Sequence, residues 1–191
     1  MRSLKIVVLA LLLLGVVLLG ASFQLPLQHE VEQSIVLEAK PEKIYPYLEN
    51  PTLWEKWNVI NSTADPSMIR LYSGPMVGAG ARMQWSGDRV GKGEVVFLES
   101  ISPKQLSYKQ LNGDNTAILN GSISLEVAEK GTKVTWTLNC PVKDEPLERW
   151  LGVWNKYKKH EELEQGLLRL KNLFEEDLTK HKAGRKLTAR N

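Results

Sequence analysis

Residues 118–140 read ILNGSISLEVAEKGTKVTWTLNC, and this stretch decides the fold class. Apolar and polar residues alternate on both sides of Lys130-Gly131, and the apolar set is Ile123, Leu125, Val127, Val134, Trp136, Leu138 and Cys140. Strict alternation predicts strands with one buried face, and the Lys130-Gly131 pair predicts a tight turn between them. Because so short a turn can join only antiparallel neighbours, the stretch predicts an antiparallel hairpin.

The same pattern continues toward the N-terminus. Strands are predicted at 31–37, 68–72, 81–85, 91–100 and 105–111. Glycine-containing turns separate the later ones, at 73–75, 86–88 and 112–115. Short turns between successive strands predict an antiparallel meander, since parallel pairs need long crossovers.

Two short helices are predicted between the first strand and the second. Pro41 suits the first position of a helix over 42–48. Asn50-Pro51 breaks the chain and starts a second helix that carries Trp54 and Trp57. Three residues apart on a helix, the two indoles are expected to pack together.

The C-terminal part changes its period. Its apolar residues are spaced by four, three, four and four positions, at Leu163, Leu167, Leu170, Phe174 and Leu178. This spacing predicts an amphipathic helix of about 20 residues. The segment 146–158, with Trp150 and Trp154, is either a shorter preceding helix or an ordered loop.

These elements predict an α+β domain. An antiparallel sheet with one apolar face needs a cover, and the last helix carries the large apolar stripe that is available. We therefore expect a curved antiparallel sheet wrapped around the long C-terminal helix, with the two small helices closing one end. Glycines that would help the sheet to bend cluster at one set of strand ends, at Gly78, Gly80, Gly87, Gly91 and Gly93.

The N-terminus carries a membrane segment. Arg2 and Lys5 precede a run without a polar side chain at 6–19, and apolar or small residues extend it to Phe23. The length lies between a signal-peptide core and a membrane-spanning helix, and Gly20 with Ser22 is only a weak cleavage site. We favour an uncleaved single-pass anchor over a removed signal.

With the basic residues on the cytoplasmic side, the rest of the chain lies on the extracytoplasmic side, periplasmic or extracellular, and is secreted if the segment is cleaved. The expected divisions are a membrane anchor or signal segment at 1–23, a linker at 24–30, the folded domain at 31–179 and a basic tail at 180–191.

Composition and charge exclude several classes. Hydrophobic residues make up 42% and charged residues 25%, as in an ordinary globular protein. The net charge is +3, but the tail alone holds five basic residues and no acidic one, so the remainder is near −2 and is no nucleic-acid platform. The tail is either a solvated terminus or a contact with anionic lipid headgroups.

Metal and disulfide sites are not expected. Cys140 is the single cysteine, and the three histidines lie far apart and outside the clearest strand patterns. With no set of ligand-spaced residues, no metal and no cofactor are predicted.

Several short motifs resemble one superfamily in this order. They are Pro51 with Trp54 and Trp57, the 78–85 strand, Gly91-Lys92-Gly93, the 131–136 strand and Gly166-Leu167 with Leu170-Lys171. Over about residues 30–178 the chain resembles the START-like superfamily, which includes the polyketide cyclase/dehydrase (SRPBCC-type) family, plant pollen allergens and Hsp90-activator-type domains. The resemblance implies a helix-grip fold with an apolar cavity between the sheet and the long helix, used to bind lipids and other hydrophobic molecules.

The cavity that the resemblance implies would be lined by inward-facing residues, each of which would equally suit an ordinary core. The candidates are Trp57, Met83, Trp85, Phe97, Tyr108, Trp136 and Leu167. Tyr108 and the three tryptophans at this site each carry a polar atom that needs a partner when buried.

Three functions are left open. The first is a membrane-anchored, non-catalytic domain that binds a hydrophobic small molecule or lipid. The second is a cyclase- or dehydrase-like enzyme that uses Tyr108; no nucleophile with a base, carboxylate pair or phosphate loop supports it, so catalytic residues are unknown. The third is a protein-interaction or chaperone-like domain, whose contact surface would be Trp150 with Trp154 if both are exposed. No nucleic acid is expected, and a protein partner is not identified.

Overall fold

The computed structural model describes the backbone of residues 2–113 and 117–188, and the side chains of 4–113 and 118–176. The side chains of the predicted basic tail, and that of Leu178 in the predicted apolar stripe, lie outside the described residues.

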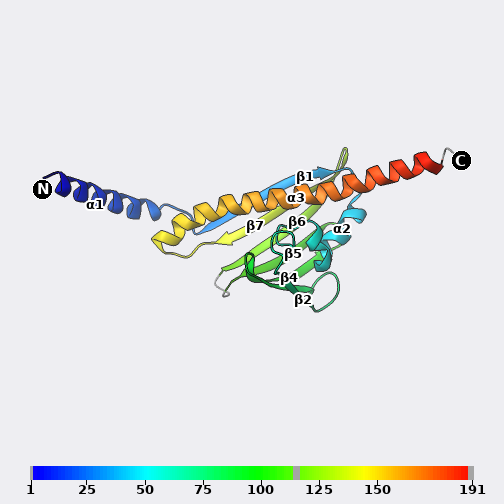
Figure 1. The fold of residues 1–191 in the computed structure, drawn as a ribbon, viewed down its shortest axis with the longest axis horizontal. Coiled ribbons are helices and arrows are strands. Elements are labelled where there is room, and N and C mark those ends of the chain that lie inside the picture. Colours follow the sequence, from blue (N-terminus) through cyan, green and yellow to red (C-terminus); the bar gives the residue numbers. More distant parts are fainter. Residues whose placement is uncertain (1, 114–116, 189–191) are drawn as a thin grey trace.

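A single antiparallel sheet forms the body of the domain (Figure 1). Its seven strands are β1 (Gln28–Leu37), β2 (Ile69–Ser73), β3 (Arg82–Gly87), β4 (Gly91–Ile101), β5 (Gln105–Asn112), β6 (Ala117–Ala128) and β7 (Gly131–Pro141). They lie in the order β1-β7-β6-β5-β4-β3-β2. The predicted meander from β2 to β7 is confirmed, and β1 returns to pair with β7 at the edge.

The first strand is longer than predicted. It begins at Gln28 rather than Val31, because Gln28 pairs with Pro141 and the β1–β7 ladder runs on to Leu37 opposite Thr132. The last three residues of the predicted linker at 24–30 therefore belong to the sheet.

The C-terminal segment is one helix, α3 (Pro146–Thr188), and not two elements. Pro146 starts it, and no proline follows to break it. The sequence pattern changes at about residue 160 because the apolar side chains change face. Those of the first part point to solvent, whereas Leu163, Leu167 and Leu170 are buried against the sheet. Figure 1 shows α3 running alongside β1 and past α2.

Two short elements close the end of the sheet opposite α1, as predicted. They are α2 (Pro41–Glu49) and the 3-10 helix η1 (Pro51–Lys56). Trp54 donates from Nε1 to the Leu48 carbonyl at 2.7 Å, and Trp57 donates to the Tyr47 carbonyl at 3.0 Å. The ring centroids of Trp54 and Trp57 are 5.1 Å apart, so the predicted indole pair is confirmed.

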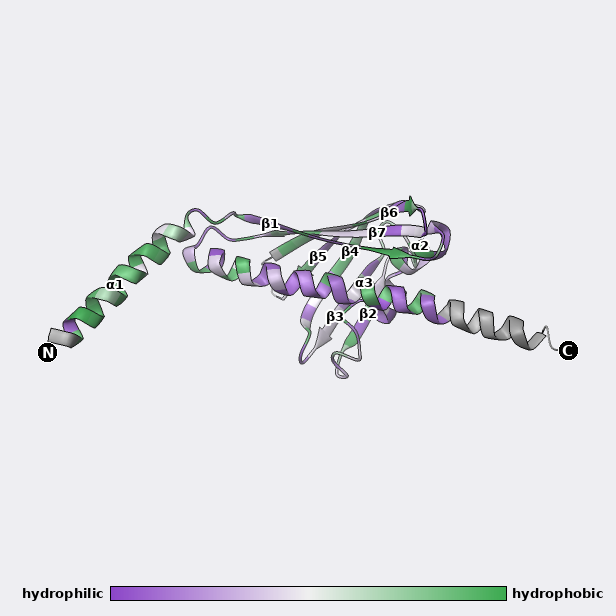
Figure 2. Ribbon diagram, turned by 90° about the horizontal axis from the view of Figure 1, so that it is seen from above, coloured by the Kyte–Doolittle hydropathy of each residue, from purple (hydrophilic) through white to green (hydrophobic). Residues whose placement is uncertain are grey.

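The N-terminal helix α1 (Arg2–Ser22) stands apart from the domain (Figure 1). Figure 2 shows it as hydrophobic along almost its whole length, and its apolar side chains are exposed. Within the described part of the chain, it is the one helix that is long and apolar enough to cross a membrane, over Leu4–Ser22. A membrane span and a signal sequence both have this property.

Candidate functional site

The seven predicted cavity residues come together. Trp57, Met83, Trp85, Phe97, Tyr108, Trp136 and Leu167 are all buried and belong to one apolar cluster. The Trp57 and Trp136 ring centroids lie 5.3 Å apart, edge to face. The cluster lies between the sheet and α3, where the resemblance implies a cavity. That these side chains line a ligand cavity stays a prediction.

A hydrogen bond joins Tyr108 and Trp136 inside the cluster. Trp136 donates from Nε1 to the Tyr108 hydroxyl at 2.7 Å, so the buried indole N–H of Trp136 has a partner. Burial raises the pKa of Tyr108, the Trp136 hydrogen bond opposes this, and nearby Cys140 and Glu162 add to it. The phenol is therefore protonated at neutral pH, so its hydroxyl can donate a hydrogen bond but cannot act as a base.

Two glycines let these rings lie close to the backbone. A Cβ on Gly121 of β6 would overlap the Tyr108 ring. A Cβ on Gly166 of α3 would lie 2.7 Å from Cζ3 of Trp136. The Tyr108 ring thus packs on Gly121 and the Trp136 ring on Gly166, and the two rings fill the space between the sheet and this part of α3.

Closer to α1, the sheet and α3 separate and leave an open groove of about 520 Å³. Its lining comes from the ends of four strands and from α3: His29, Asn112, Leu119, Cys140, Pro141, Val142, Lys143, Glu148, Gly152, Asn155, Lys158, Lys159 and Glu162. The volume lies within the range of about 300–1,000 Å³ that is usual for small-molecule sites. None of the seven predicted residues lines it.

His29 is the groove residue that the sequence analysis missed. It lies on β1, is buried, and pairs with Cys140 of β7 in the ladder. Its Nε2 is buried without a hydrogen-bond partner and faces Gly152 of α3, where a Cβ would come within 3.2 Å. Burial, and then the charge of Lys156, lower the pKa of this imidazole. The signal was present in the sequence, since His29 is in step with Val31, two residues on, which is also buried.

The inner end of the groove holds a thiol and an ion pair. Lys159 Nζ lies 2.5 Å from Glu162 Oε2. Burial raises the pKa of the half-buried Cys140 thiol, an effect that Lys159 opposes and Glu162 increases. The thiol is thus protonated at neutral pH and is a weak nucleophile. Among the described residues, no three His, Cys, Asp or Glu side chains gather closely enough to hold a metal ion.

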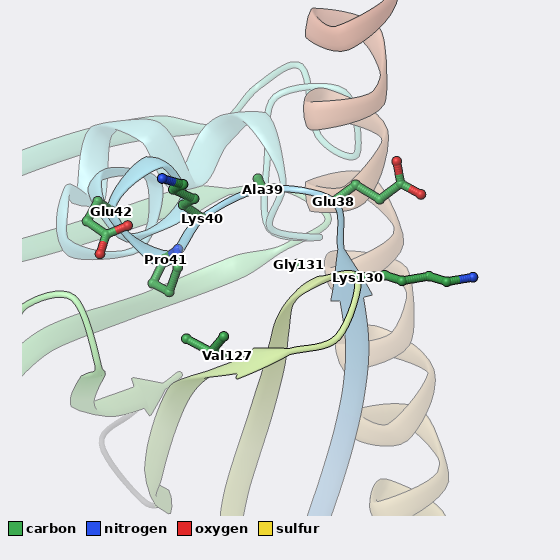
Figure 3. A pocket seen from close by; sticks show the side chains of 8 residues that line it. All are labelled: Glu38, Ala39, Lys40, Pro41, Glu42, Val127, Lys130 and Gly131. Atoms are coloured by element: carbon green, nitrogen blue, oxygen red, sulfur yellow. The ribbon is translucent and has the colours of Figure 1, made fainter.

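Two other hollows are shallower. Trp85 lines one of about 340 Å³ over β2, β3 and β4. The other, of about 640 Å³, lies between the β1–α2 junction and the β6–β7 turn. Figure 3 shows Pro41 and Val127 facing each other across it, while Glu38 and Lys130 point away. It is open surface at the end of the domain remote from α1, and it offers few converging groups.

The groove lies at the α1 end of the domain, and a set of hydrogen bonds holds α1 there. Arg149 of α3 is buried and donates to the carbonyls of Ser22 at 3.1 Å and Leu25 at 3.2 Å. It also pairs with Asp144, and its guanidinium lies 5.5 Å from the Phe23 ring centroid. The segment between α1 and β1 is thereby bound to the start of α3.

Next to this clamp, Trp150 and Trp154 are 41% and 62% exposed. The exposure that the protein-interaction hypothesis requires is therefore present.

Comparison with known proteins gives the family. The model of the family described as "Polyketide cyclase / dehydrase and lipid transport" matches residues 28–175. No curated protein matches the chain in sequence.

Solved structures share the fold. A protein of unknown function from Staphylococcus aureus superposes with a TM-score of 0.59 at 13% identity, covering 80% of this chain and 96% of that one. A protein from Mesorhizobium loti gives 0.57 at 18% identity, covering 78% and 98%. The Aha1 dimer from Colwellia psychrerythraea gives 0.53 at 18% identity, covering 76% and 96%. At these identities the likeness concerns the fold alone, and it is the helix-grip fold that the resemblance implied.

Proposed function

The chain belongs to the polyketide cyclase / dehydrase and lipid transport family, and on that premise we propose that it is a membrane-anchored protein that binds a hydrophobic small molecule or lipid between its sheet and α3. The observation that carries the proposal is the groove of about 520 Å³ that opens beside the end of α1. Binding, rather than catalysis, is the proposed role.

The groove has the chemistry of an amphiphile site. Leu119, Pro141 and Val142 supply apolar surface. Lys143 and Lys158 at the rim supply positive charge that suits a carboxylate or phosphate on the ligand. Apolar walls with a few polar groups that fix orientation are usual for such sites.

The inner end of the groove lies next to the aromatic cluster. Cys140 and Glu162 line the groove and are also close enough to act electrostatically on Tyr108. Within the cluster, Tyr108 with its partner Trp136 is therefore near the groove residues Cys140 and Glu162. A ligand chain longer than the groove would enter the cluster by displacing these two rings.

The position of the groove suits a ligand that comes from a membrane. We take α1 as an uncleaved span with Arg2 and Lys5 on the cytoplasmic side, which puts the domain on the extracytoplasmic side. Because Arg149 binds the end of α1, the groove stays next to the bilayer, the main store of apolar ligands.

Photo-crosslinking tests the proposal. The full chain is reconstituted in lipid nanodiscs that contain a fatty acid with a diazirine in its acyl chain. We expect adducts on peptides that carry Leu119 or Cys140, because these residues form the floor of the groove. Adducts confined to α1 would contradict the proposal.

A matched pair of variants identifies the groove as the site. Asn155→Trp places a large ring in the groove from the exposed side of α3 and should remove most of the adducts. Glu164→Trp adds the same ring at an exposed α3 position outside the groove and should leave them unchanged. Equal losses in both variants would show that the adducts do not report on the groove.

A cyclase- or dehydrase-like enzyme is the second candidate, favoured by the protonated Tyr108 beside the groove. In that case the neutral Tyr108 hydroxyl would donate a hydrogen bond that polarises a bound substrate. Tyr108→Phe would then abolish turnover and leave ligand binding intact, whereas unchanged turnover would remove Tyr108 from the reaction.

A further inference from the structure

The first turns of α3 carry an apolar stripe that faces away from the domain. Leu147, Trp150, Leu151 and Trp154 are all exposed, at spacings of three, one and three residues. Such spacing puts them on one face of a helix. The opposite face of the same turns holds the buried Arg149 and Gly152. This segment is therefore amphipathic with its apolar face outward, the reverse of what a core helix shows.

The stripe lies against the end of α1. Trp150 donates from Nε1 to the Leu18 carbonyl at 3.4 Å, inside the last turns of α1. One position before it, Arg149 holds the Ser22 carbonyl. Figure 1 shows α3 beginning beside the end of α1 and then running away from it. Only the first turns of α3 therefore lie beside α1, and the later turns lie beyond its end.

If α1 spans a bilayer, its length fixes the depth at which the first turns of α3 lie. The 19-residue candidate span Leu4–Ser22 is about 28 Å long at 1.5 Å per residue, so a hydrocarbon core of about 30 Å needs its whole length. Leu18 then lies about 6 Å inside the end of the span. Amphipathic helices at membrane surfaces bury their apolar faces about 5–10 Å into the boundary between headgroups and acyl chains, and the contact with Leu18 puts Trp150 at a similar depth.

We infer that the first two turns of α3 lie in the headgroup region of the membrane that α1 spans, with the stripe turned toward the acyl chains. The inference rests on the proposed anchor. Tryptophan is enriched at this depth because its ring is apolar and its N–H is polar. Lys158, whose Nζ lies 5.9 Å above the Trp154 ring, follows the stripe at the level where a cation meets lipid phosphates. This second contact would fix the tilt of the domain and hold the groove against the surface.

Quenching of tryptophan fluorescence tests the inference. The full chain is reconstituted in phosphatidylcholine vesicles, with or without bromine on the upper acyl carbons. The other four tryptophans, Trp54, Trp57, Trp85 and Trp136, are buried in the domain and should be quenched little. We expect clear quenching of the wild type and loss of most of it in a Trp150→Phe, Trp154→Phe double variant. The residues replaced are exposed, so the fold should persist.

The outcomes separate the inference from the proposed anchor. A chain that stays with the vesicles after an alkaline wash, but is quenched no more than the double variant, would overturn the inference and leave the anchor standing. A chain removed by the wash would overturn both. Stronger quenching of Trp150 than of Trp154, measured with the two single variants, would support the inference, because α3 begins beside the end of α1 and then runs away from it.

Discussion

Gly166 lies in the interior of α3, although glycine in an isolated helix is less stable than alanine. The structure shows why a glycine is needed there. The Trp136 ring lies against this position, so α3 can pack this closely on the sheet only because residue 166 has no side chain. Gly166-Leu167 is one of the motifs that resemble the superfamily, and the close contact between Gly166 and Trp136 explains its glycine.

Gly166→Ala is expected to destabilise the domain by about 1 kcal/mol. Overpacking against a buried ring costs about 1–3 kcal/mol, and the better helix propensity of alanine returns only about 1 kcal/mol of it. Urea denaturation gives the free energy of unfolding. The neighbouring Gln165→Ala, at an exposed position, should change stability by less than about 0.5 kcal/mol. A stabilised Gly166→Ala variant would mean that Trp136 moves aside freely.

Asp65 ties the loop after η1 to the β3–β4 hairpin. Its carboxylate accepts from the Ser67 hydroxyl at 2.6 Å, from the Arg89 N–H at 2.6 Å and from the Val90 N–H at 3.0 Å. The Ser67 hydrogen bond, followed by those from the Arg89, Val90 and Ser67 backbone, lowers the pKa of this carboxyl well below its usual value. The charged form is therefore the one that the fold stabilises.

The stability that Asp65 contributes should depend on pH in one direction. Because the pKa is lower in the folded chain, the contribution is complete above the unfolded value of about 4 and is lost as the pH falls toward the folded value. Asp65→Asn should reduce stability at neutral pH, and its difference from wild type should shrink below about pH 4. Denaturation across pH 2–7 measures it. Asp88→Asn, on the same hairpin, shows the effect of one lost charge alone.

At the scale of elements, the two parts of α3 make different contacts. Its later turns bury Leu163, Leu167 and Leu170 and form the core. Its first turns carry Arg149 inward and a tryptophan stripe outward. A long helix can do this because it extends beyond the sheet that it covers (Figure 1). The result is a continuous rigid connection from the core to the end of α1.

Arg149→Gln should loosen this connection. The variant leaves the Ser22 and Leu25 carbonyls without the guanidinium that binds them. An unsatisfied buried group costs about 1–3 kcal/mol, so the equilibrium for local opening of residues 22–27 should shift toward the open form by about five-fold or more. Limited proteolysis of the full chain in nanodiscs measures the rate of cleavage in this segment.

The matched control for Arg149 is Lys171→Gln. It removes a cation from the same helix, at a half-exposed position where Lys171 pairs with Glu175. We expect its cleavage rate between residues 22 and 27 to equal that of wild type. Equal rates in the Arg149 variant and in wild type would show that β1 pairing alone holds the segment.

At the scale of the whole molecule, the groove and α1 lie at the same end. The α2–η1 end is closed by tryptophans, whereas the α1 end is open between the sheet and α3. If α1 is the anchor that we propose, this polarity would orient ligand exchange toward the membrane. The end of α1 is also tied to the folded domain, because Arg149 donates to the carbonyl of Ser22.

We expect the mature chain to retain residues 1–23 and to expose its domain on the extracytoplasmic side. The positive-inside rule predicts that Arg2 and Lys5 stay on the cytoplasmic side, and the Gly20–Ser22 cleavage signal is weak. An immunoblot should show the full-length mass of 21.6 kDa in the membrane fraction. Protease added to intact cells with a permeabilised outer envelope should degrade the domain. A shorter, soluble product would instead indicate a diffusible carrier.

The regular elements could be predicted because their signals are local. Alternation around Lys130-Gly131 predicted the β6–β7 hairpin, and the apolar spacing from Leu163 predicted the packed part of α3. The seven cavity candidates were recognisable as inward-facing, and they meet in one cluster. The groove was not predicted, since its lining joins His29 of β1 and the first turns of α3 to the ends of β5, β6 and β7, and the sequence shows no local sign of that meeting.

The sequence by itself determined the sheet, its order of strands from β2 to β7, the covering helix and the apolar N-terminal segment, because periodicity and turn chemistry act between near neighbours. Only the tertiary structure decided which face of α3 meets the sheet, that 146–158 joins it as one helix, and that Arg149 and Ser22 lie together. It also decided that His29 is buried with an unpartnered nitrogen beside an open groove. The contact of Arg149 with Ser22 and the approach of His29 to Gly152 join residues more than a hundred positions apart, and no local pattern records them.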